Sequence, residues 1–116
     1  TMDEALYLYR QLIERRMPFA GFIVNRVHNV ATRPSANQLF DELAGLEENR
    51  FDAEFIETLR VAYERLAKLS ASDAASIADL KAAVDEGISV RQVPFADAEV
   101  TDLTRLKNIC DCLNPE

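Results

Sequence analysis

Two short apolar runs, each ending at a polar residue or a proline, predict the strands of a parallel sheet. The first covers residues 21–27 and turns polar at Asn25, and the second covers about 88–93 and ends before Pro94. An apolar run with an abrupt end is typical of a buried parallel strand that delivers a side chain to the carboxyl edge of the sheet, where open α/β folds bind their ligands. Proline ends the second strand because it cannot donate to a ladder.

Amphipathic helices are expected before, between and after these strands. Thr1 and Glu4 have the spacing of a capping box, so a helix should begin at residue 2, and Pro18 should end it. Ser35, Asp52 and Thr101 are suitable caps for later helices. The helices after the first are expected over 35–46, 52–69, 72–83 and 101–113. The resulting order is α-β-α-α-α-β-α, an α/β fold with a two-stranded parallel sheet and a helical insert at about 30–87.

Three of the expected helices have apolar faces that should be buried. In chain order, these faces are Ala5, Leu6, Leu8, Tyr9, Leu12 and Ile13; Phe55, Ile56, Leu59, Ala62, Tyr63, Leu66 and Leu69; and Leu103, Leu106, Ile109, Cys110 and Leu113. Within the last helix we expect Cys110 in the core and Cys112 partly exposed. The two cysteines are too close in sequence for an ordinary disulfide and too few for a zinc site, which indicates reduced thiols.

A two-stranded sheet leaves two open edges and has little stability by itself. Further strands are therefore expected, from an upstream stretch of the same polypeptide or from a second copy. The sequence starts at a helix cap, and Met is the second residue. This start favours the interpretation that residues 1–116 are a single C-terminal fragment of a longer chain.

Charge and composition narrow the choice of partners. The net charge is −7, and the segment after Pro34 holds seventeen acidic and eight basic residues, so nucleic acid is not an expected partner. The sequence shows neither an apolar stretch of membrane-spanning length nor a secretion signal, which predicts a cytoplasmic protein without a transmembrane segment. A P-loop is also missing, because the lysines lie far from Gly21, Gly45 and Gly87.

Several segments together resemble a known family. They are residues 3–7 (DEALY), 12–27 (LIERRMPFAGFIVNRV) and 93–95 (VPF). These segments are similar to the C-terminal part of the arsenical-pump-driving, anion-transporting ATPases, which belong with the tail-anchored-protein targeting ATPases among P-loop proteins with a deviant Walker A motif. The resemblance covers 1–27 and 88–113, and it does not extend over 30–87.

The resemblance implies a site that recognises adenine. In that family the Asn at the end of this strand hydrogen-bonds the adenine edge, and the loop after the Val-Pro strand closes over the base. These roles would fall on Asn25 and on Pro94 and Phe95, with Arg26 beside the base. The phosphate loop and magnesium ligand would lie before Thr1, so ATP and Mg²⁺ belong to the complete ATPase, and neither is expected to bind this fragment tightly. The expected partners are the rest of the ATPase domain, a second copy in a homodimer, and a membrane protein.

Each of these residues also has a simpler interpretation. Asn25 could be a turn residue that bonds its own backbone, Arg26 a surface charge, and Phe95 a plug of the core. The whole chain could instead be a non-enzymatic interaction module, in which the acidic helices from 35 to 86 dock a partner protein. This sequence lacks a Cys-x-x-Cys between the strands, so it does not support a zinc-bridged dimer.

Overall fold

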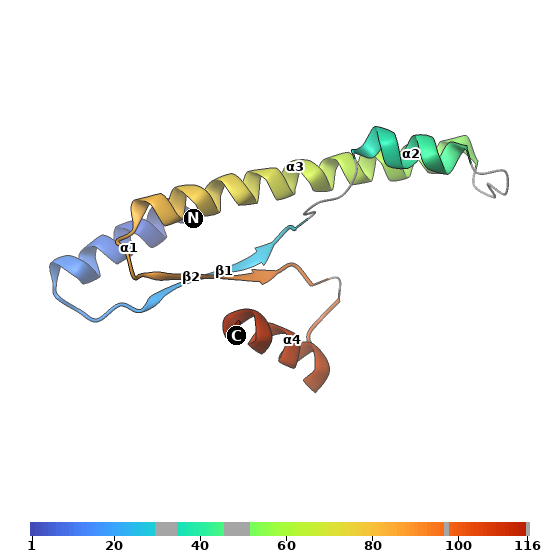
Figure 1. Ribbon diagram of the computed structural model, residues 1–116. Coiled ribbons are helices and arrows are strands. Elements are labelled where there is room, and N and C mark those ends of the chain that lie inside the picture. Colours follow the sequence, from blue (N-terminus) through green and yellow to red (C-terminus); the bar gives the residue numbers. More distant parts are fainter. Residues whose placement is uncertain (30–34, 46–51, 97, 116) are drawn as a thin grey trace. The chain divides into compact units, whose positions relative to one another are not determined.

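The computed structural model describes residues 1–29, 35–45, 52–96 and 98–115 (Figure 1). Within these residues the elements are α1 (Met2–Glu14), β1 (Gly21–Val27), α2 (Ala36–Ala44), α3 (Ala53–Ala83), β2 (Ser89–Pro94) and α4 (Leu103–Leu113). The expected α/β class and parallel sheet are confirmed. The helices expected over 52–69 and 72–83 form the single helix α3, because no proline or glycine interrupts it. The expected end of α2 at Leu46 lies outside the described residues.

The chain divides into two compact units. The first combines residues 1–27 with 73–116, and the second covers 28–72. Helix α3 is shared between them, since its last turns carry Ile77 and Leu80 into the core of the first unit. The second unit therefore holds α2 and the first part of α3, and it overlaps most of the expected helical insert.

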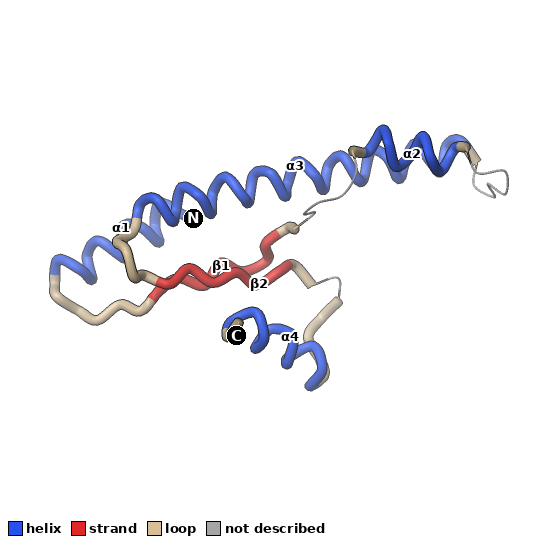
Figure 2. Tube along the Cα trace, in the orientation of Figure 1, coloured by secondary structure: helices blue, strands red, loops and turns tan. Residues whose placement is uncertain are grey.

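In the first unit, β1 and β2 run side by side in parallel (Figure 2). Gly21 lies opposite Ser89 at the start of the pairing, and Val24 lies opposite Gln92. A Cβ atom at Gly21 would collide with the carbonyl oxygen of Ser89 and lie 3.0 Å from its carbonyl carbon and Cβ. The absence of a side chain at this position is therefore what lets the two backbones approach.

Helix α1 covers one face of the sheet through Tyr9, which is 5% exposed. Its ring lies 5.2 Å from that of Phe19 and 5.8 Å from that of Phe22. The phenol donates a hydrogen bond of 2.7 Å to Asp85 Oδ2 and accepts one of 3.3 Å from the Asp85 backbone N–H. The bond to this carboxylate raises the pKa of Tyr9 above its ordinary value. Tyr9 thus ties α1 to the turn between α3 and β2.

The apolar faces of α1 and α4 are covered less than expected. Leu8 and Ile13 of α1 are exposed, as are Leu103 and Leu106 of α4, of which Leu103 is 83% exposed. On α4 the two thiols are also reversed, since Cys110 is exposed and Cys112 is half-buried. The reason is that α4 turns a different face, which includes Cys112, toward the end of β2.

In the second unit, α2 packs on α3 through the rings of Phe40 and Tyr63, whose centroids are 6.1 Å apart. The apolar face expected on this part of α3 is covered only on the side toward α2. There Ile56 and Tyr63 are half-buried, whereas Leu59 and Leu66 are each 40% exposed. None of the described helices is long and apolar enough to cross a membrane.

We expect Gly21→Ala to destabilise the protein by about 1–3 kcal/mol, because the added methyl group forces β1 away from Ser89. Gly45→Ala is the matched control. Gly45 has a φ of −82°, and its Cβ would lie 3.5 Å from the nearest atom, so alanine should be neutral or stabilising by about 0.4–1 kcal/mol. Urea unfolding of both variants is the measurement, and equal stabilities would refute the close approach of the strands.

Candidate functional site

At its carboxyl end, β1 contains one residue more than the strand it pairs with. Val24 lies opposite Gln92 and Val27 opposite Pro94, so Asn25 and Arg26 together occupy the length of a single residue of β2. Arg26 adopts a φ of +58°, in the left-handed region. Such a β-bulge bends the strand and redirects its side chains, and bulges are common beside functional sites.

The side chain of Asn25 stabilises this bulge. Its Oδ1 accepts a hydrogen bond of 2.9 Å from the backbone N–H of Arg26. The local turn role considered for Asn25 is therefore present in the structure. It does not use up the amide, because a carbonyl oxygen has two lone pairs and the NH₂ group has two donors. The exposed Asn25 side chain can hold the bulge and still bind a ligand.

The chain after β2 is anchored next to the bulge. Phe95 donates its backbone N–H to the carbonyl oxygen of Val27 over 2.9 Å. This bond extends the pairing one residue past β2. The bond places the start of the following loop beside Asn25 and Arg26.

All four residues expected at the site line one hollow of about 310 Å³ at this edge of the sheet. The remaining lining residues are Val93, Ala96, Ala98, Glu99, Val100 and Ile109. Phe95 is 52% exposed, so it forms part of the wall and does not plug the core. The structure therefore brings Asn25, Arg26, Pro94 and Phe95 together, although they are far apart in sequence.

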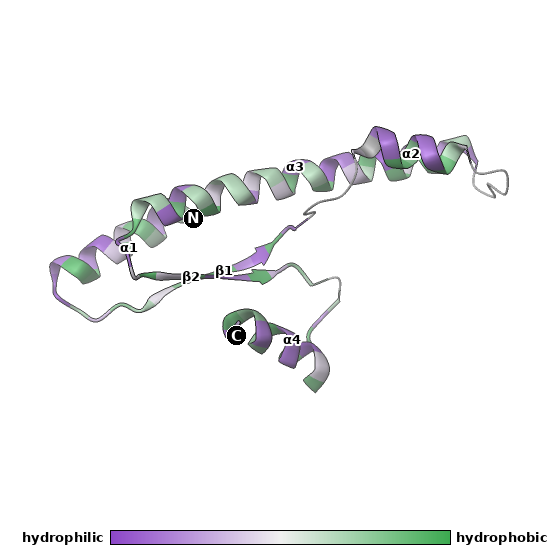
Figure 3. Cartoon of the chain, viewed as in Figure 1, coloured by the Kyte–Doolittle hydropathy of each residue, from purple (hydrophilic) through white to green (hydrophobic). Residues whose placement is uncertain are grey.

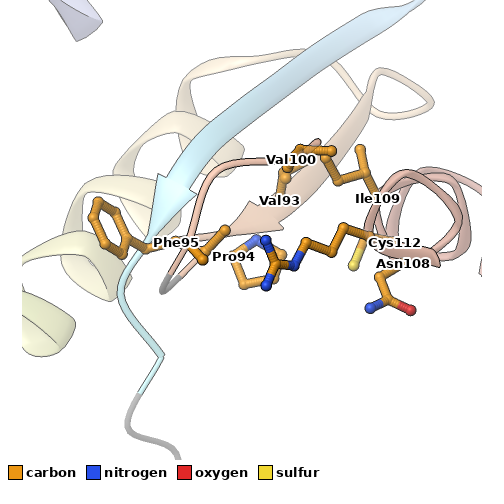
Figure 4. A pocket seen from close by; sticks show the side chains of 10 residues that line it. Val93, Pro94, Phe95, Val100, Asn108, Ile109 and Cys112 are labelled. Carbon is orange, nitrogen blue, oxygen red and sulfur yellow. The ribbon is translucent and has the colours of Figure 1, made fainter. Parts of the chain in front are cut away.

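A second hollow of about 250 Å³ shares the same loop wall and extends to α4 (Figure 4). There the lining includes Arg105, Asn108, Ile109 and Cys112. Their spacing of three, four and seven residues from Arg105 places them on one face of the helix. Hydrophobicity alone predicts only Ile109 of these four residues in the covered face of the helix, although their spacing is visible in the sequence.

The loop between β2 and α4 is closed onto the first turn of α4 by Arg105. Its guanidinium donates to the carbonyl oxygen of Glu99 over 2.7 Å. Asp102 caps the helix, with Oδ1 accepting from the Arg105 backbone N–H at 2.8 Å and the carboxylate 3.8 Å from the guanidinium. These contacts hold Val100 in place as a wall of both hollows.

The hollows combine apolar walls with a few polar groups. Arg26 and Arg105 contribute positive charge and Glu99 negative charge, and Arg26 forms no ion pair within the part of the chain that the structure describes. Elsewhere on α4, a hydrogen bond to Asp111 raises the pKa of Lys107. A flat apolar ring with a hydrogen-bonding edge fits such a lining.

The described ranges contain no group of three or more His, Cys, Asp or Glu side chains placed to hold a metal ion. No protein-family model and no curated protein sequence matches the chain. The resemblance to anion-transporting ATPases therefore stays a prediction. Any function has to be inferred from the hollow and the residues that line it.

The bulge makes a prediction about Arg26. A β-branched residue is strained at positive φ, so Arg26→Val should destabilise the protein by about 1–2 kcal/mol, whereas Arg26→Gly should be tolerated. Arg91, an exposed residue of β2 opposite Ile23, is the control position. There the valine variant should be more stable than the glycine variant. Urea unfolding of the four variants is the measurement. The same order of stability at both positions would contradict a left-handed Arg26.

Proposed function

We propose that the hollow at the ends of β1 and β2 binds the adenine ring of ATP. The observation that carries this proposal is that the bulge and the Phe95–Val27 bond bring Asn25, Arg26, Pro94 and Phe95 into one lining. Ligands of open α/β folds bind at this edge of the sheet. The apolar walls and the small number of polar groups are also typical of sites for small planar ligands.

Asn25 is the residue suited to read the base. Its NH₂ group can donate to a ring nitrogen of adenine, while the second lone pair of Oδ1 accepts from the exocyclic amino group. Pro94 and Phe95 offer apolar surfaces to the ring. The guanidinium of Arg26 can stack on the base or contact a phosphate. Each residue thus has a role that its chemistry allows.

The wider proposal follows the family resemblance. In it, the chain is the C-terminal, adenine-recognising portion of an anion-transporting-type ATPase, whose phosphate loop and magnesium ligand belong to the remainder of the ATPase domain. Mg²⁺ would assist attack of water on the γ-phosphate there, and nucleotide turnover would move a homodimer between states. A membrane protein is the partner such a cycle would serve. Residues 1–116 would contribute base recognition and no catalytic residue.

A second candidate is a non-enzymatic interaction module. It is favoured by the exposed leucines of α3, which leave an apolar surface available to another helix. The two candidates differ in what they require of Asn25: the interaction module needs it for the bulge alone, and the nucleotide site needs it for the ligand as well.

For the 116-residue chain we expect adenosine and ATP to bind with similar, weak affinity. Without a phosphate loop the triphosphate has few partners, so the dissociation constants should be no tighter than about 1 mM, or about 4 kcal/mol. Amide chemical shifts in an NMR titration are the measurement, and they should move at Asn25, Arg26 and Phe95. Micromolar ATP binding would place a phosphate site within these residues. Unmoved shifts at about 10 mM adenosine would rule out the base site.

Replacing Asn25 by Asp separates the two roles of the side chain. The carboxylate keeps an acceptor for the Arg26 N–H, so the bulge should survive, but the donor to the ring nitrogen is lost. We expect adenosine binding to weaken by about 1–3 kcal/mol and the preference over guanosine to narrow. The same NMR titration measures the weaker binding as a lower fraction of protein bound at a fixed adenosine concentration.

The control for this variant is Gln92→Glu, which makes the same amide-to-carboxylate change on the neighbouring strand at an exposed position outside the hollow. It should leave binding unchanged. If Asn25→Asp binds adenosine and guanosine as the unaltered chain does, Asn25 belongs to the bulge alone and the proposal fails.

A further inference from the structure

Hydrophobic residues recur along helix α3 (Figure 3). In its first part, some of them form an exposed row with the spacing of a coiled coil. The row, here named the α3 seam, consists of Phe55, Leu59, Ala62, Leu66 and Leu69, separated by steps of four and three residues. That alternation is the heptad pattern of helices that pair along a seam. The four large side chains are each 40–44% exposed. At 1.5 Å per residue, the seam is roughly 20 Å long.

The two sides of the α3 seam differ. On one side, Ile56 and Tyr63 are half-buried, and Tyr63 contacts Phe40 of α2. On the other side every flanking position is exposed, and Val61, at 46%, widens the apolar surface. Within the second unit, α2 therefore covers one side of the seam and leaves the seam itself accessible.

The α3 seam is complementary to itself when it is reversed. Phe55 and Leu69 each lie seven residues from Ala62, and Leu59 and Leu66 lie three and four residues from it. A second copy in antiparallel orientation would place Leu59 against Leu66 of the second copy, and Phe55 against Leu69. Ala62 would lie on the two-fold axis, where a small side chain allows the helices to approach. A self-complementary patch is the requirement for a two-fold interface.

The flanking charges select the antiparallel orientation. On the open side, Glu54 lies near the start of the seam, and Arg65 and Lys68 lie near its end. None of these three forms an ion pair within the described part of the chain. In an antiparallel pair, Glu54 of one copy lies at the level of Lys68 of the other. In a parallel pair, the open side of each copy would instead face the side of the other copy on which Tyr63 contacts α2, so Glu54 and Lys68 would not meet.

We propose that the α3 seam is an interface between two copies of this chain, paired antiparallel about Ala62. This interface is separate from the open strand edges, where a second copy was one of the two expected sources of further strands. It also holds whether or not the hollow binds a nucleotide, because no residue of the seam lines that hollow.

Sedimentation equilibrium of the 116-residue protein over a concentration series tests the interface. We expect a dimer. Leu66→Glu should raise its dissociation constant at least about tenfold, because a charged group replaces a leucine that is buried when the two copies pair. The control is Leu103→Glu on α4, where the leucine is 83% exposed, which should have no effect. A monomer at about 100 μM, or a dimer that both variants weaken equally, would overturn the proposal.

Charge exchange tests the orientation without introducing a buried charge. Glu54→Lys and Lys68→Glu should each raise the dissociation constant of the dimer about two- to fivefold. The double variant should return to the dissociation constant of the unaltered chain. Circular dichroism confirms that each variant keeps its helices. If the double variant has a higher dissociation constant than both single variants, the antiparallel pairing is contradicted.

Disulfide trapping gives an independent readout of the two-fold axis. With Cys110 and Cys112 replaced by serine, Ala62→Cys should oxidise to a covalent dimer. Leu59→Cys should remain monomeric on a denaturing gel, because it opposes a position near residue 66 of the second copy. A parallel pair would cross-link through both. Cross-linking of Leu59→Cys at the rate of Ala62→Cys would therefore refute the arrangement.

Discussion

Parallel pairing of β1 with β2 brings the carboxyl ends of two distant segments to one edge of a sheet, and the other features of the first unit depend on it. The pairing requires Gly21, where the backbone of Ser89 leaves no room for a side chain. It sets Phe22 against the ring of Tyr9 in α1 and Val93 toward α4, so each face receives a helix. Without this pairing, the groups that line the hollow would have no common location.

One extra residue in β1 changes this edge from a simple strand end into a wall of the hollow. A regular pairing would place a single residue opposite Val93, with its side chain on one face of the sheet. The bulge places Asn25 and Arg26 there instead, and the Asn25 carbonyl holds the left-handed Arg26 in place. The cost of that backbone conformation, about 1–2 kcal/mol for a residue with a side chain, is the kind of local strain that is common at functional sites.

Sequence patterns predicted the two strands, because an apolar run and a proline are local signals. The family resemblance selected Asn25, Arg26, Pro94 and Phe95, which the structure places in one lining, and their role in binding stays a prediction. The bulge was not predictable, since it depends on which residue of β2 lies opposite each residue of β1. The lining face of α4 was predicted only at Ile109, because its polar members such as Asn108 carry no hydrophobic signal, and hydrophobicity wrongly selected Leu103 and Leu106. The break expected between residues 69 and 72 was wrong because serine and alanine continue a helix without strain.

We propose that Asn25, held at the bulge, reads the edge of a purine while Phe95 contacts its ring. Intermolecular nuclear Overhauser effects between adenosine and the isotope-labelled chain test it most directly. We expect contacts from the adenine ring protons to the Asn25 side-chain amide and to the Phe95 ring. Contacts confined to other surfaces, or none in a sample whose amide shifts show adenosine bound, would contradict it.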